Sequence, residues 1–263
     1  MTIVDSHCHA SPSWYEPVES LLFQMDRNGV DKALLIQMYG QTNNEYLTQC
    51  VRRYPDRFGS VVLLDTASTD APQRLEELVE QGASGLRLRN TMRSPGDDPL
   101  AVWRKAAELG VPVSCGGPSE VFASDEFIQL VQSLPAVSIV IEHLGSTNRP
   151  DGEQPPHPLR RKVFTLARFP NVFIKVHGLG EIALRTTPIT EPFPFEQPVP
   201  PLLEMVYQSF GAHRMMWGSD FPVVSSREGY HNALRLVQEH LYAKSENERR
   251  AIFGGTAISV FKP

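Results

Sequence analysis

The fold of this chain is decided by the stretch TIVDSHCH, residues 2–9, and by the residues directly after it. The stretch is a short apolar run that ends in two histidines, His7 and His9, on either side of Cys8. In an open doubly wound sheet that binds a nucleotide, a glycine-rich phosphate loop comes after the first strand. No such loop comes after residues 2–9, and this favours a closed barrel over the open sheet.

Short apolar runs recur along the chain and alternate with longer amphipathic segments. The runs are rich in Val, Ile, Leu or Met, as buried parallel strands are, and they cover residues 2–9, 32–38, 59–65, 84–89, 111–117, 137–143, 171–177 and 214–220. The segments between them predict helices over residues 16–29, 42–55, 70–82, 98–110, 124–135, 157–170, 199–211, 228–244 and 245–255, with Asp70 as an N-cap. Eight βα units in about 250 residues match a (β/α)8 TIM barrel, an α/β fold. We therefore expect residues 1–263 to form a single barrel domain.

The composition excludes several classes of partner. The chain has 263 residues and a net charge of −5, and it carries no basic segment of the kind that binds nucleic acid. No apolar stretch reaches the roughly 20 residues that cross a bilayer, and the N-terminus does not resemble a secretory signal. Its three cysteines, an odd and scattered set, fit a reducing compartment. We expect a cytoplasmic protein with a small-molecule partner, and leave a homo-oligomer open.

Polar side chains stand at the C-terminal end of the first run, and barrel enzymes carry their active sites at that face. Side chains alternate along a strand, so Asp5, His7 and His9 are expected to share the inner face. Val4 and Cys8 are then expected to point toward the helices. The pair of histidines suits one cation or one carbonyl oxygen.

The sixth and eighth runs end in the same way. Alternation places His143 on one face with Ile139 and Ile141 and turns Glu142 to the opposite face. Asp220 ends the eighth run, where an aspartate serves as a helix N-cap, a metal ligand or a general base. Because the eighth strand of a closed barrel pairs with the first, Asp220 is expected near His7 and His9.

The motifs VDSHCH, IVIEHLG and WGSDFP, in this order and at these strand ends, resemble the amidohydrolase superfamily over nearly the whole chain. The likeness is to its amidohydrolase-related branch of lactonases and non-oxidative decarboxylases, especially the sugar, 2-pyrone-4,6-dicarboxylate and sulfomuconolactone hydrolases. The resemblance implies a catalytic core of His7, His9, His143 and Asp220. His7, His9 and Asp220 would hold a divalent metal, Zn or Mn, and Asp220 and His143 would be the catalytic groups.

Two departures from the superfamily pattern bear on the metal. The fourth run, GLRLR, has no lysine or glutamate to bridge two metals, so one metal at most is expected. The fifth run, PVSCGG, has Cys115 and Gly116 where many mononuclear members, decarboxylases included, have a histidine. This weakens the decarboxylase interpretation and leaves a metal-free site open.

Further residues are candidates for binding the substrate. Arg87 and Arg89 share a face of the fourth run and are expected either to pair with acids such as Asp5 and Asp65 or to clamp a substrate carboxylate or sulfonate. Candidates for contact with the substrate are His177, Trp14 and Tyr15. The long Pro-rich connections 145–158 and 185–201 leave the same barrel face, as walls of the pocket or as an interface.

The function expected from these residues is the hydrolysis of a lactone that carries an anionic group. Asp220 would activate a water molecule, while His7, His9 and His143 would stabilise the oxyanion. Two alternatives stay open. One is a metal-dependent decarboxylase of an aromatic or unsaturated acid, and the other is a non-catalytic barrel that binds a metabolite.

Overall fold

The computed structural model describes residues 1–147 and 155–263, and its centre is a sheet of eight parallel strands. Neighbouring strands are hydrogen-bonded in the order β1 to β8. The strands are β1 (Val4–Cys8), β2 (Lys32–Ile36), β3 (Phe58–Val62), β4 (Gly85–Arg89), β5 (Val113–Gly116), β6 (Ile139–Ile141), β7 (Val172–Val176) and β8 (Met215–Trp217). Each predicted apolar run contains one of these strands, except that β3 begins one residue before its run, and the predicted (β/α)8 barrel is confirmed.

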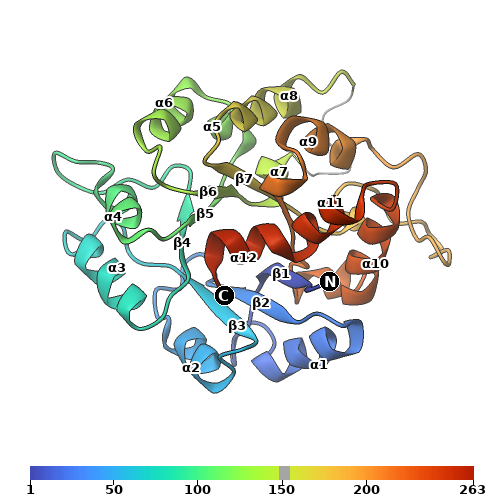
Figure 1. Cartoon of the computed structure of the whole chain (residues 1–263), viewed down its shortest axis with the longest axis horizontal. Coiled ribbons are helices and arrows are strands. Elements are labelled where there is room, and N and C mark those ends of the chain that lie inside the picture. Colours follow the sequence, from blue (N-terminus) through green and yellow to red (C-terminus); the bar gives the residue numbers. More distant parts are fainter. Residues whose placement is uncertain (148–154) are drawn as a thin grey trace.

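Helices surround the sheet and connect its strands (Figure 1). They are α1 (Val18–Asn28), α2 (Glu45–Arg53), α3 (Ala71–Glu80), α4 (Ala101–Leu109), α5 (Ser119–Phe122), α6 (Asp125–Ser133), α7 (His143–Ser146), α8 (Pro158–Phe164), α9 (Leu202–Phe210), α10 (Tyr230–His240), α11 (Glu246–Arg250) and α12 (Thr256–Phe261). Each predicted helical segment contains a helix, whereas α5, α7 and α12 were not predicted. Asp70 stands at the N-cap of α3, but its side chain accepts a hydrogen bond from Ser68 instead of capping the helix.

The barrel closes between β1 and the residues that come after β8. The backbone amide of Asp220 donates to the carbonyl of His7, and that of His9 donates to the carbonyl of Phe221, both at 2.7 Å. The two segments approach so closely that a Cβ atom on Gly218 would lie 2.7 Å from the Cβ of His7. A glycine is therefore needed at this position, and closure brings His7, His9 and Asp220 to one place.

An irregularity in β1 changes the direction of its side chains. The register with β2 shifts between Asp5 and Cys8. Val4 packs with Leu34 and Val140, from strands on opposite sides of the barrel, and therefore lies inside it. Asp5 instead accepts a 2.9 Å hydrogen bond from the hydroxyl of Tyr230, at the start of α10. The predicted directions of Val4 and Asp5 were wrong, because the shift interrupts the two-residue alternation.

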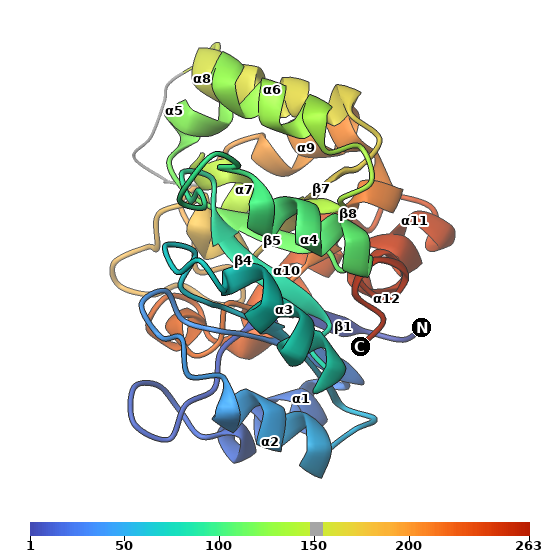
Figure 2. The same cartoon turned by 90° about the vertical axis from the view of Figure 1, so that its left-hand side faces the viewer.

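The two ends of the barrel differ. At the N-terminal end, Ala257 and Phe261 of α12 pack onto the interior cluster that contains Val4 and Leu34. Figure 2 shows α12 and both chain termini on one side of the molecule and long connections on the other. The C-terminal ends of the strands face these connections, and the functional residues gather there.

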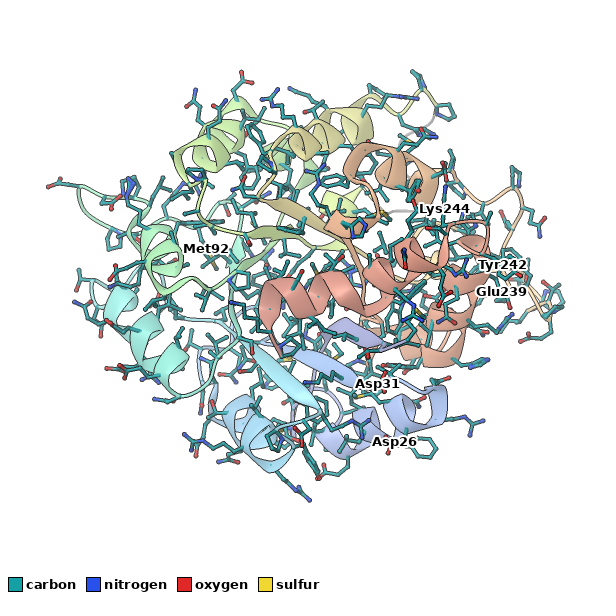
Figure 3. The ribbon with its side chains drawn as sticks, viewed as in Figure 1. Asp26, Asp31, Met92, Glu239, Tyr242 and Lys244 are labelled. Atoms are coloured by element: carbon teal, nitrogen blue, oxygen red, sulfur yellow. The ribbon has the colours of Figure 1, made fainter. Side chains whose placement is uncertain are left out.

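Charged side chains cover the outside of the barrel. Asp26 of α1 and Glu239 of α10 lie at the periphery (Figure 3), with side chains that are 65% and 58% exposed. Within residues 1–147 and 155–263, no helix has the length and apolar character to cross a membrane.

Candidate active site

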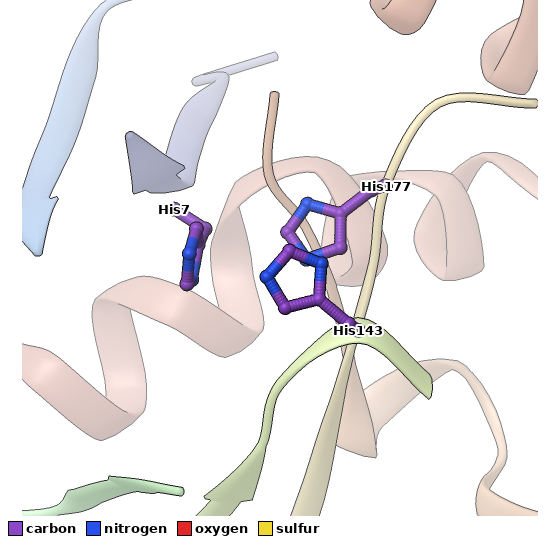
Figure 4. A group of neighbouring side chains, drawn as sticks. All are labelled: His7, His143 and His177. Atoms are coloured by element: carbon purple, nitrogen blue, oxygen red, sulfur yellow. The ribbon is translucent and has the colours of Figure 1, made fainter. Parts of the chain in front are cut away.

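Four imidazole rings meet at the C-terminal end of the barrel. Figure 4 shows the ring of His7 facing those of His143 and His177. The centroid of the His7 ring lies 4.9 Å from that of His143, 5.0 Å from that of His177 and 5.0 Å from that of His9. His143 and His177 stack at 4.3 Å. The residues come from β1, β6 and β7 or directly after them, so the barrel brings together histidines that are far apart in the sequence.

Asp220 lies against this cluster, where barrel closure was expected to place it. One of its carboxylate oxygens is 3.6 Å from Nε2 of His9 and 3.8 Å from Nε2 of His7. Burial raises the pKa of Asp220, but the contact with His9 and the charge of His143 outweigh burial and hold it below its usual value. Its backbone is left-handed, with a φ of 62°, a conformation that L-residues rarely adopt. The site therefore holds an ionised carboxylate.

His143 reaches the mouth by an unusual backbone path. Ile139 and Ile141 pack in the outer core and Val140 lies inside the barrel, so alternation alone would turn His143 outward. His143 has a φ of 49°, and the next three residues of α7 also have positive φ. The prediction from alternation was wrong for Glu142, which faces the barrel interior. A strained turn brings His143 to the site, as often happens at functional positions.

Glu181 is a neighbour of His143 that the sequence analysis missed. Its carboxylate accepts a 2.9 Å hydrogen bond from Nδ1 of His143 and also a 3.1 Å bond from Arg227. Burial lowers the pKa of His143, but the charge of Glu181 and this hydrogen bond raise it to about 9. His143 is therefore an imidazolium at neutral pH, with Nε2–H as its remaining donor. Glu181 lies after β7 in a short helical turn, and no pattern in the sequence pointed to it.

We expect Glu181→Gln to lower the pKa of His143 from about 9. The amide removes the negative charge that favours protonation most, while the burial that opposes protonation stays. An NMR titration of the imidazole signals, assigned with His143→Gln, measures the change. Because the folded-state pKa lies above 6.5, the charge of His143 stabilises the fold below that pH and ceases to do so as the pH rises through about 9. Glu246→Gln, which breaks an exposed pair, is the control and should leave the titration unchanged.

A chain of buried polar groups runs beneath the imidazoles. Arg87 donates to both carboxylate oxygens of Glu142, at 3.1 and 2.9 Å, and the hydroxyl of Ser114 donates to the same carboxylate at 2.7 Å. Lys175 lies 2.9 Å from Ser114 and 3.2 Å from Nδ1 of His7. Burial alone would raise the pKa of Glu142, but Arg87 and Lys175 hold it well below its usual range. Burial lowers the pKa of Lys175 to about 8.

This chain of contacts changes the interpretation of the two arginines. Arg87 does not pair with Asp5 or Asp65, as one sequence-based alternative had it, but with Glu142. The guanidinium of Arg89 lies 3.9 Å from the centre of the Tyr39 ring. In the described parts of the chain, no carboxylate lies within ion-pair distance of Arg89. A positive charge at the mouth is thus left for an anion.

The donor atoms fit a metal ion. Nδ1 of His9 lies 2.7 Å from the carbonyl oxygen of Ile36, and Nδ1 of His177 lies 2.9 Å from that of Gly218. With the ring proton on Nδ1, the Nε2 atom of each ring has a lone pair that can bind a metal. Burial lowers the pKa of His177 to about 4 and that of His7 well below 6.5, so both rings are neutral. Nε2 of His7 and Nε2 of His177 are buried, with no hydrogen-bond partner among the described residues. His7, His9 and Asp220 have ligand atoms close enough to hold one ion. His7, His143 and His177 are also close enough, but His143 would first have to lose its Nε2 proton.

Zinc is expected to raise the Tm of protein that has been stripped of metal. A ligand present at 100 times its Kd stabilises the folded state by about 2.7 kcal/mol. The variant His9→Ala should lose most of this shift, measured by differential scanning fluorimetry. His231→Ala, at an exposed histidine bonded to Asn28, is the control and should keep it. A Tm that does not respond to Zn²⁺ or Mn²⁺ would show that the histidines serve the substrate alone.

Two adjoining cavities form the mouth. One, of about 610 Å³, is lined by Arg87, Arg89 and Glu142 among others. The second, of about 410 Å³, is lined by His9, Asp220, Trp14 and Tyr15 among others. Both include Tyr39, Arg87 and His143, so they meet there. The structure thus brings the predicted catalytic, metal and substrate residues to one mouth, with His177 stacked behind His143.

The two long connections differ in what they contribute to the mouth. Ser146 and Thr147 of the first connection line the cavity of about 610 Å³. Residues 148–154, in the first of them, lie outside the described residues. In the second, Phe193 and Phe195 pack edge to face at 5.8 Å, and neither lines the two cavities of the mouth. Their role as a wall or an interface stays a prediction.

The fold and the site together define a (β/α)8 barrel protein with a histidine and aspartate centre at the C-terminal mouth. A family model described as Amidohydrolase matches residues 4–262. The chain therefore belongs to the amidohydrolase family, as its motifs indicated.

Two curated relatives are similar in sequence. An L-fucono-1,5-lactonase from Burkholderia ambifaria is 25% identical over 245 residues, which are 90% of this chain and 81% of the relative. An uncharacterized protein from Sinorhizobium fredii is 28% identical over 138 residues, which are 52% of this chain. That match spans less than half of the relative, 43% of its length.

Solved structures share the fold at low sequence identity. A probable 2-pyrone-4,6-dicarboxylic acid hydrolase from Acinetobacter baumannii, with citric acid bound, has a TM-score of 0.78 and 20% identity, and the match covers 100% of both chains. An amidohydrolase from Burkholderia multivorans with bound zinc has a TM-score of 0.80 and 20% identity, over 100% of this chain and 99% of the other. A 5-carboxyvanillate decarboxylase from Novosphingobium aromaticivorans with bound manganese has a TM-score of 0.61 and 14% identity, over 93% and 80%.

Proposed function

We propose that this protein is a hydrolase that opens a lactone of an anionic small molecule. One observation carries the proposal: the ionised Asp220 lies 3.6 Å from His9 and 3.8 Å from His7, in a mouth that also holds Arg89, which has no acidic partner among the described residues. A carboxylate base, a set of imidazoles and an anion-binding guanidinium are the groups that hydrolysis of a charged lactone needs. The names of the Burkholderia ambifaria and Acinetobacter baumannii proteins support the same reaction class.

Asp220 acts as the base. It takes a proton from a water molecule as the water oxygen forms a bond to the ester carbon, and the negative charge moves to the carbonyl oxygen. Nε2–H of His143, a donor on an imidazolium, stabilises this oxyanion. The bond from the carbon to the ring oxygen then breaks, and Asp220 returns its proton to the leaving alkoxide. The product is a hydroxy acid.

His7, His9 and Asp220 would hold a divalent ion such as Zn²⁺ or Mn²⁺. When bound, such an ion polarises the ester carbonyl and makes a water molecule more acidic. Lys175 bears on this function, because His7 can offer Nε2 as a ligand only when its ring proton lies on Nδ1. An ammonium accepts no hydrogen bond, so that tautomer would require Lys175 to be neutral, and burial lowers the pKa of Lys175 to about 8. Without a metal, His7 and His9 would contact the substrate carbonyl directly.

Arg89 would bind the substrate's anionic group. Arginine offers a planar pair of donors that matches a carboxylate or a sulfonate. Its guanidinium is already held against Tyr39, so little freedom is lost when the anion binds. Arg87 supports Glu142 from beneath and lines both cavities.

The test is a panel of lactones with and without a carboxylate, assayed for acid release by pH-stat before and after chelation. We expect hydrolysis of the carboxylated lactones, with a higher KM in Arg89→Gln. Release of CO2 from aromatic or unsaturated acids, with no lactone opened, would replace the proposal with the decarboxylase alternative. If the protein neither opens a lactone nor releases CO2 but still binds the acids, the result would favour a non-catalytic barrel that binds a metabolite.

A further inference from the structure

The second cavity of the mouth has a chemistry that anion binding and hydrolysis leave unexplained. Four of its lining residues are Trp14, Tyr15, Met38 and Val223, which are mostly apolar and share the cavity with His9 and Asp220. We call these four residues the apolar wall. A polyhydroxylated ring would need several hydrogen-bond partners here, and the wall supplies two polar groups, the hydroxyl of Tyr15 and the indole N–H of Trp14.

The apolar wall is also exposed. Trp14 is 73% exposed, Val223 41% and Tyr15 38%, among the large hydrophobic side chains that the structure leaves in solvent. Tyr15 is fixed by a ring contact of 5.3 Å with His9, so the wall is anchored to a catalytic-site residue. Exposed apolar side chains that gather in one concave place mark a binding site.

The two adjoining cavities suit two chemically different ends of one ligand. The first cavity holds Arg89 and the second holds the apolar wall, and His143 lies in both. An ester carbonyl beside His143 and Asp220 therefore has a positive charge on one side and an apolar surface on the other. The second cavity, at about 410 Å³, exceeds the roughly 150 Å³ that holds a benzene molecule.

We propose that the substrate is an amphiphilic lactone, with a carboxylate that binds Arg89 and an apolar ring substituent that packs on the apolar wall. The catalytic part of this inference rests on the proposed lactonase function, and the binding part does not. Burying an apolar group in such a pocket commonly changes specificity by about tenfold or more.

The experiment compares two carboxylated lactones that differ only by a phenyl group on the ring carbon remote from the carboxylate. We expect kcat/KM to be about tenfold higher for the phenyl lactone in the unaltered protein, and Trp14→Ser to bring the ratio close to one. Phe23→Ser, which changes an exposed aromatic side chain of α1 outside both cavities, is the matched control and should keep the ratio. Equal rates for the two lactones, or faster turnover of a polyhydroxylated lactone, would overturn the inference and leave the proposed function standing.

If no lactone is hydrolysed, a binding experiment still tests the amphiphilic ligand separately from the proposed hydrolysis. The same two lactones are titrated calorimetrically into Asp220→Asn protein. Tighter binding of the phenyl lactone, lost in Trp14→Ser, supports the amphiphilic ligand even though lactone hydrolysis has failed. Equal Kd values overturn it. If Trp14→Ser lowered the molar mass measured by light scattering and left the ratio unchanged, the apolar wall would be a contact between copies and the inference would be wrong.

Discussion

Asp220→Asn should lower kcat by about a thousandfold while the protein stays folded, because an amide accepts no proton from water at neutral pH. General-base catalysis contributes roughly 10²- to 10⁴-fold. The carboxylate is also the negative group nearest to Nε2 of His9, so its loss removes charge at the reacting centre. The measurement is the initial rate of acid release from a carboxylated lactone at saturating concentration.

Asp97→Asn is the matched control for this variant, since Asp97 is exposed and lies in the loop after β4. It should retain full activity. Far-UV circular dichroism and Tm establish that the Asp220 variant is folded. Activity within about tenfold of the unaltered protein would remove Asp220 from the role of base.

Arg87→Met should destabilise the fold by about 3–5 kcal/mol, the range for breaking a buried ion pair by removing one partner. Arg87 and Glu142 have side chains that are only 6% and 1% exposed. Without the guanidinium, the buried carboxylate keeps the hydroxyl of Ser114, the more distant hydroxyl of Tyr39, the nearby ammonium of Lys175 and, 4.0 Å away, Nδ1 of His7, a neutral ring. Urea denaturation followed by tryptophan fluorescence gives the change in the free energy of unfolding.

The double variant Arg87→Met/Glu142→Gln tests the cause of that loss. Removing the second charge should recover part of the stability, because the penalty comes from the uncompensated carboxylate. Arg74→Met breaks an exposed pair with Glu77 and should cost less than about 1 kcal/mol. A cost for Arg87→Met as small as that of Arg74→Met would show that the buried pair contributes no stability.

Local signals in the sequence were sufficient for the elements and for their order. Apolar runs separated by amphipathic segments predicted all eight strands, and the order of the sheet confirms the barrel. Closure then predicted that Asp220 lies near His7 and His9, because the first and last strands of a barrel are neighbours. These inferences succeed because burial of a strand or a helix face selects apolar residues at a fixed spacing.

The directions of side chains at the strand ends were not predictable in the same way. Alternation failed at Val4 and Asp5, where β1 is irregular, and at Glu142, where the strand leads into a left-handed turn at His143. One extra residue in a ladder reverses every later direction, and a positive φ does the same at a single position. Neither leaves a periodic signal, since both depend on contacts with other strands.

The sequence by itself determined that this chain is an eight-unit barrel of the amidohydrolase family, with His7, His9, His143 and Asp220 at one end. Only the tertiary structure decided which side chains carry charge there. Glu181 holds His143 as an imidazolium, Glu142 neutralises Arg87, and Arg89 has no acidic partner in the described chain. The reason is that an ionisation state depends on burial and on neighbours within a few ångströms, and these neighbours come from distant strands that only the closed barrel brings together.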